Sequence, residues 1–166
     1  IDPAKQEQTR QSARRLAALF VLGGYQTIAR KHDSINALTP QAFCGSPSLA
    51  WETTSGKGKF PVTGAVLHDL LGSALFTAVR PPSTAEPEPA FGFTHQNYAE
   101  FLAAEYLKNL EVEQLRGLLM KLGPGGEMVP GPLVETASWL AVMHQDWFSY
   151  LLKHTPEILI RSDGAQ

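Results

Sequence analysis

Residues 93–107 read FTHQNYAEFLAAEYL, and this stretch decides more about the fold than any other part of the chain. The apolar residues 90–93 lead into an amphipathic helix, and Thr94 is placed to act as its N-cap. Spacings of three to four residues predict a core-facing stripe formed by Tyr98, Phe101, Leu102 and either Tyr106 or Leu107. His95 falls beside the first turn, where free backbone N–H groups and the helix dipole favour an anion such as phosphate. The same position suits a histidine that only caps the helix.

The residues upstream of this stretch predict a helix followed by a hairpin with a long tip. The expected elements are a helix over 4–22 ending at Gly23, a weak turn or two within 25–35, a short helix start over 39–43, a loop over 46–61, a helix over 62–71 ending at Gly72, and strands over 74–79 and 90–93. The proline-rich residues 81–89 separate the two strands and cannot form regular structure. This order is that of a winged-helix domain, which we place at residues 1–110 with its wing tip at about residues 80–90.

The residues downstream predict helices joined by short turns. They cover 96–110, 112–122, 133–143, 146–154 and a final short helix from Thr155 to Ile160, with a glycine-rich break at 123–126. Successive helices of this kind resemble the start of an α-solenoid, which we place at residues 111–166. The expected fold is therefore mainly α with a small β-hairpin: a winged helix followed by antiparallel helix pairs.

Composition narrows the class of protein. Of 166 residues, 43% are hydrophobic and 18% are charged, so we expect a sizeable core rather than disorder. A net charge of −2 gives no support to nucleic-acid binding. Cys44 is the only cysteine, which excludes an internal disulfide. No apolar run approaches the ~20 residues of a membrane-spanning helix, and we expect a cytoplasmic protein. Because the chain starts at Ile1 without methionine, we also expect it to be a segment of a longer protein.

Residues 93–107 resemble the winged-helix segment of NACHT-type STAND NTPases, the signal-transduction ATPases that include the NOD-like receptors. The resemblance rests on Phe93-Thr94-His95 followed by AEFLAAEYL at residues 99–107. The sequence RRLAAL at residues 14–19 is similar to the first winged-helix element of bacterial members. The stretches 135–141 and 156–159 are similar to the helical repeats that follow it.

The resemblance implies a non-catalytic regulatory segment. In that family the winged helix packs on a nucleotide-binding domain, and the histidine that matches His95 reaches the β-phosphate of ADP and helps to latch the closed state. The implied cofactor is ATP or ADP with Mg²⁺, held by the parent protein and not by this segment. The implied partners are the nucleotide-binding domain and the sensor repeats of the same chain, with possible oligomerisation of the parent; neither a nucleic acid nor a membrane is implied.

The sequence contains no P-loop motif, G-x-x-x-x-G-K-[ST]. Residues 56–59 (GKGK) resemble only part of that motif. We therefore expect that this segment does not hydrolyse ATP, although its parent is an ATPase. The histidines elsewhere offer little chemistry. His68-Asp69 lacks a suitable nucleophile, since Ser73 lies at a helix end, and His144, Asp146 and His154 lack a metal-ligand spacing. We predict no catalytic and no metal-binding residue.

Several further residues are expected to be structural. Glu100 lies about one helical turn from Gln96 or Asn97. We expect its side chain to form a hydrogen bond at the surface or to another helix. The aromatic residues of the second half are expected in the core between paired helices: Trp139, Trp147, Phe148 and Tyr150.

Two other functions remain open from the sequence. The first is a DNA-binding winged helix with residues 62–71 as its recognition helix; that helix has no lysine or arginine to contact phosphates. The second is a helical scaffold that binds a protein through its repeat-like C-terminal half.

Overall fold

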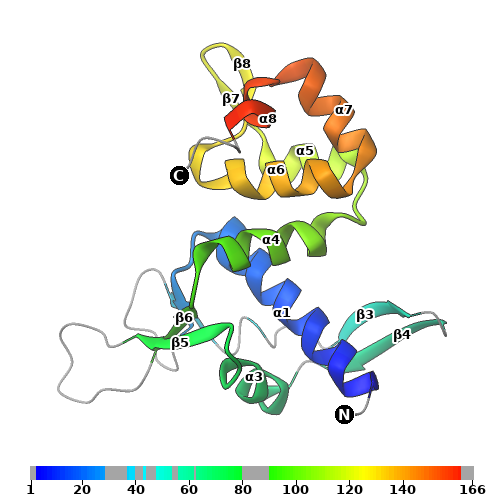
Figure 1. Ribbon diagram of the computed structural model, residues 1–166, viewed down its shortest axis with the longest axis vertical. Coiled ribbons are helices and arrows are strands. Elements are labelled where there is room, and N and C mark those ends of the chain that lie inside the picture. The colour runs from blue at the N-terminus through cyan, green and yellow to red at the C-terminus, as the bar shows by residue number, and fades with distance from the viewer. Residues whose placement is uncertain are drawn as a thin grey trace.

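The computed structural model describes residues 3–28, 37–39, 43, 48–53, 56–61, 63–79 and 90–161. Over these residues the protein is mainly helical with small strand pairs, as the sequence predicts. Figure 1 shows two groups of elements that meet at α4 (Gln96–Leu107), which lies between α1 (Pro3–Gly23) and α6 (Val134–Met143). The helix that carries the 93–107 stretch therefore joins both halves.

Five of the elements that precede α4 follow the winged-helix order. They are α1, β1 (Thr27–Ile28), α3 (Gly64–Leu71), β5 (Phe76–Val79) and β6 (Ala90–Phe93). The strand order is β2-β1-β6-β5, in which β6 pairs antiparallel with both β1 and β5, and β2 (Ala37–Leu38) adds a parallel edge. A first strand that pairs with the returning strand of a later hairpin is the winged-helix topology. The predicted strand over 90–93 is confirmed, and the expected wing tip at 80–89 lies outside the described residues.

Local signals explain these boundaries. Gly24, with φ of 66°, ends α1, and the Tyr25 N–H then donates to the Phe20 carbonyl at 2.9 Å. Thr63 caps α3 by accepting from the Val66 N–H at 3.4 Å. Of the short helix expected over 39–43, only Thr39 and Phe43 are described; Phe43 is helical and fully buried, and its N–H donates to the Thr39 carbonyl at 3.1 Å. The core of this half contains Ala13, Leu16, Phe20, Ile28, Leu38, Phe43, Leu67, Leu70 and Phe76.

One prediction in this half is wrong. The described residues of the loop expected over 46–61 form a hairpin instead, because β3 (Ser48–Thr53) and β4 (Gly56–Pro61) pair antiparallel from Ser48↔Pro61 to Thr53↔Gly56. The ladder uses backbone groups, so a composition rich in Gly, Ser, Thr and Lys does not prevent it. Residues 27–28 form β1, in which Ile28 pairs with Phe91 of β6; residues 29–35, most of the range expected to hold a weak turn or two, lie outside the described residues.

The second half surrounds a core built on Trp147. Its elements are α5 (Val112–Leu119), β7 (Lys121–Gly123), β8 (Gly126–Met128), the 3₁₀ turn η1 (Gly131–Leu133), α6, α7 (Gln145–His154) and α8 (Glu157–Arg161). Trp147 is fully buried, and its indole N–H donates to the Ala137 carbonyl at 3.1 Å. The predicted helix over 112–122 is wrong at its end. Residues 121–128 form the β7–β8 hairpin, with Pro124 in its turn and Gly126 at φ of 114°.

The buried face of α4 differs from the predicted stripe. Tyr98 is 47% exposed and Phe101 is 37% exposed, whereas the residues that face the neighbouring helices are mostly small: Ala99, Glu100, Ala103, Ala104 and Leu107. Because α4 packs against α1 and α6, alanines let both backbones approach closely while the larger rings turn outward. Apolar residues lie around most of the circumference of α4, so spacing alone could not select the buried face.

None of the helices in the described residues is both long and apolar enough to cross a membrane.

Candidate functional site

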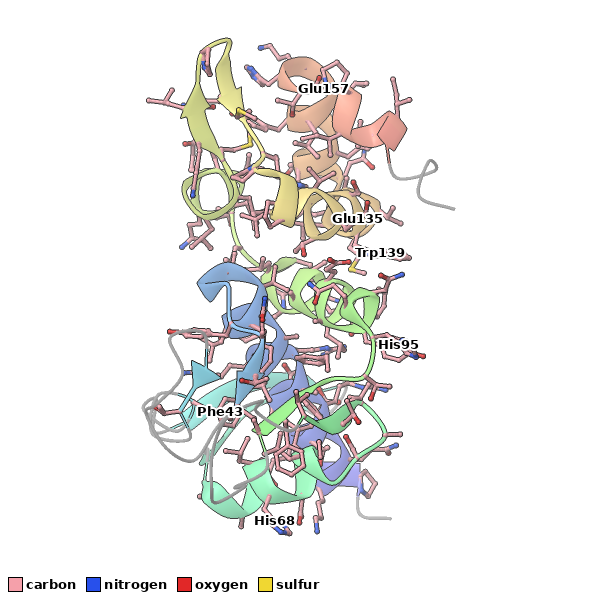
Figure 2. The ribbon with its side chains drawn as sticks, turned by 90° about the vertical axis from the view of Figure 1, so that its left-hand side faces the viewer. Phe43, His68, His95, Glu135, Trp139 and Glu157 are labelled. Carbon is pink, nitrogen blue, oxygen red and sulfur yellow. The ribbon has the colours of Figure 1, made fainter. Side chains whose placement is uncertain are left out.

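His95 lies at the N-cap position of α4 with extended backbone angles, φ −137° and ψ 135°. Its side chain is exposed, makes no capping hydrogen bond, and meets the Tyr98 ring edge-on at a centroid distance of 5.3 Å. Figure 2 shows the His95 ring projecting from the molecule on the same side as Glu135 and Trp139. The imidazole is therefore available to an external group beside the first backbone N–H groups of a helix.

Thr94 does not cap α4, contrary to the prediction. Its hydroxyl donates to the Ala74 carbonyl at 3.0 Å, and its N–H donates to the Leu75 carbonyl at 2.8 Å. Thr94 is thus tied to the residues just before β5, and the helix begins at Gln96, as predicted, with His95 instead of Thr94 at the N-cap position. These two hydrogen bonds of Thr94 fix the position of the next residue, His95, at the end of β6.

Glu100 lies one turn into α4 and is only 7% exposed. Burial raises the pKa of its carboxyl group, a side-chain hydrogen bond with Gln96 lowers the pKa, and the nearby Glu135 carboxylate raises it. The hydrogen bond expected on the surface or between helices instead joins Glu100 to Gln96 within α4, and Glu100 is buried. A buried carboxylate beside a second acid is a costly arrangement that the sequence did not reveal.

The aromatic residues predicted for the core divide into two groups. Trp147 is fully buried, and Phe148 and Tyr150 are partly buried, so these three contribute to the core or its edge. Trp139 is 40% exposed, which contradicts the prediction, and it meets Phe101 edge-on at 5.4 Å. It is left outside because Ala137, Leu140 and Ala141 occupy the inner face of α6.

The other histidines that the structure describes have different surroundings from those of His95. His68 is exposed on α3, and its neighbour Asp69 pairs with Lys5 at 3.3 Å. His144 caps α7: its Nδ1 accepts from the Trp147 N–H at 3.2 Å, and its Nε2 lies 3.0 Å from the Leu110 carbonyl. His154 stacks on Tyr150 at 4.5 Å. Among the described residues, no group of three or more His, Cys, Asp or Glu side chains could hold a metal ion.

A polar cluster on the β7–β8 hairpin was not predicted. The Arg116 guanidinium donates through Nε to both Glu127 oxygens, at 2.8 and 2.9 Å, and the Tyr150 hydroxyl donates to Glu127 at 2.5 Å. These bonds lower the pKa of Glu127, mainly through Arg116, while burial and then Glu127 raise the pKa of Tyr150 to about 12. The cluster ties the hairpin to α5 and α7 and is structural.

No family model, curated protein or solved structure was found to match this chain. The candidate site is therefore defined by its own geometry: an exposed histidine at the start of α4 that contacts the Tyr98 ring and lies on the same side of the molecule as Glu135 and Trp139.

Proposed function

We propose that this chain is a regulatory winged-helix segment of a STAND-type signal-transduction NTPase, and that His95 contacts the β-phosphate of an ADP held by another domain. The observation that carries the proposal is the His95 imidazole, which is exposed at the N-cap of α4 and is not used for capping. A phosphate placed there would meet both the imidazole and the first N–H groups of the helix.

The proposed partners are the nucleotide-binding domain and the sensor repeats of the same longer chain, with ATP or ADP and Mg²⁺ bound by that domain. The segment itself would contribute one phosphate contact and no hydrolytic chemistry, because its sequence has no P-loop motif. A cytoplasmic location follows from the same proposal. Such a contact biases an equilibrium between closed and open states without setting it alone.

A DNA-binding role has weaker support. The exposed residues of α3 include His68 and Asp69, and α3 carries neither lysine nor arginine. Duplex DNA is a polyanion, so a recognition helix without cations and with an exposed carboxylate is poorly suited to it.

In the full-length protein, His95→Ala is expected to accelerate ADP release about ten- to hundredfold, because one hydrogen bond to a charged group contributes about 1–3 kcal/mol. The measurement is the dissociation rate of a fluorescent ADP analogue chased with unlabelled ADP. His68→Ala is the matched control, since Figure 2 shows His68 on α3 at the far end of the winged helix from α4. Equal release from the wild type and the His95 variant would contradict the proposal.

A further inference from the structure

Four large apolar side chains form an exposed aromatic strip along α4 and α6. They are Tyr98, Phe101, Trp139 and Val142, with exposed fractions of 47%, 37%, 40% and 82%. The two residues on each helix are three positions apart and so lie on one helix face, and Phe101 and Trp139 join the two faces by their edge-on contact at 5.4 Å. Adjacent exposed apolar side chains of this size are typical of a surface that binds a partner.

A hollow of about 340 Å³ continues the aromatic strip. Val142 borders both features, and the remaining wall of the hollow comes from Ser138, Ala141, Gln145, Phe148 and Leu159. The hollow lies where α6, α7 and α8 meet, and most of its wall is apolar. It offers a place for one large apolar side chain of a partner beside the flat surface of the strip.

The charge next to the aromatic strip is negative. Glu135 precedes Trp139 by about one helical turn and so lies on the same face of α6, and the buried Glu100 of α4 interacts with Glu135 from beneath the strip. Neither acid forms an ion pair with a lysine or arginine in the described parts of the chain, and the Glu135 carboxylate raises the pKa of the Glu100 carboxyl group. A cation brought by a partner would relieve this repulsion and would gain from the neighbouring rings.

We propose that the aromatic strip, the hollow and the two acids together bind an amphipathic helix of a partner protein that carries arginine or lysine beside its apolar stripe. The apolar stripe would cover Phe101 and Trp139, one large side chain would enter the hollow, and a cation would pair with Glu135, beside the buried Glu100. This is the helix-in-groove mode of recognition. The inference does not depend on the proposed function, because no part of it requires a nucleotide, although Tyr98 of the strip contacts the His95 ring.

The test uses the whole chain and a fluorescein-labelled helical peptide with leucines on one face and arginines on both flanks. Fluorescence anisotropy is expected to show saturable binding, which Trp139→Ala weakens about tenfold or more because aromatic residues dominate such interfaces. Leu122→Ala is the matched control: Leu122 is 87% exposed on the β7–β8 hairpin, away from α4 in Figure 1, and its loss should leave binding unchanged.

The acids are tested separately. Glu135→Gln should weaken binding several-fold and reduce its salt dependence, since one charge pair is lost. Because a cation favours the ionised form of Glu100, binding should strengthen as pH rises through the titration of Glu100, and Glu100→Gln should flatten that dependence. No binding of the arginine peptide, equal binding of a peptide with glutamate in place of arginine, or equal effects of Trp139→Ala and Leu122→Ala would each overturn the proposal.

Discussion

Replacing Trp147 by alanine is expected to lower the free energy of unfolding by about 3–5 kcal/mol. Trp147 is fully buried at the centre of the C-terminal core, and its ring stacks on Tyr150 with centroids 5.6 Å apart. The change would leave a large cavity and would also remove the hydrogen bond to the Ala137 carbonyl. Urea denaturation followed by far-ultraviolet circular dichroism measures the loss.

Trp139→Ala is the control for this experiment, because it removes the same side chain from an exposed position on α6. Its expected cost is below about 1 kcal/mol, as for other surface substitutions. Trp147→Phe fills most of the cavity and should fall between the two. Equal destabilisation by Trp139→Ala and Trp147→Ala would mean that the C-terminal core is not arranged as described.

Glu105→Ala is expected to lower the free energy of unfolding by about 1.5–3 kcal/mol, the range for hydrogen bonds to charged groups. Arg14 on α1 donates to Glu105 on α4 through Nε at 2.9 Å and through its terminal nitrogen at 3.0 Å. The two side chains are only 12% and 19% exposed, so the alanine variant leaves a guanidinium largely shielded from water. This pair therefore links α4, which follows His95, to α1.

A double-mutant cycle measures the interaction energy between Arg14 and Glu105 apart from their contacts with other residues. Arg14→Ala, Glu105→Ala and the double variant should give a coupling energy of about 1 kcal/mol or more that salt reduces only weakly. The chain supplies its own comparison in Lys5 and Asp69, which lie 3.3 Å apart at the surface, with exposed fractions of 66% and 54%. Their coupling should stay below about 1 kcal/mol and fall with salt. A coupling for Arg14–Glu105 no larger than that of the surface pair would contradict the described packing of α1 on α4.

Much of the fold could be predicted because its signals are local. Gly24 ends α1, Gly72 ends α3, and residues 90–93 are short, apolar and bounded by breaks, so these elements follow from a few neighbouring residues. The β3–β4 and β7–β8 hairpins were missed because their glycine-rich sequences resemble loops. Only the presence of a partner strand distinguishes the two cases.

The candidate site was predicted only in part. The position of His95 at the start of a helix follows from the sequence, but the exposure of Phe101 and Trp139 does not. α4 is apolar around most of its circumference, and the choice of the alanine face depends on two helices that pack against it from distant parts of the chain. For the same reason, neighbouring residues in the sequence could not predict two other features. One is the ion pair between Arg14 and Glu105, which are 91 positions apart, and the other is the burial of Glu100 against α6.

The central claim is that His95 contacts a β-phosphate, and the most direct test compares two ligands that differ by that group. In the full-length protein, calorimetric titration should show that His95→Ala weakens ADP binding about ten- to hundredfold and leaves AMP binding within about twofold of the wild type. An unchanged ADP affinity, or an equal loss for ADP and AMP, would contradict the account.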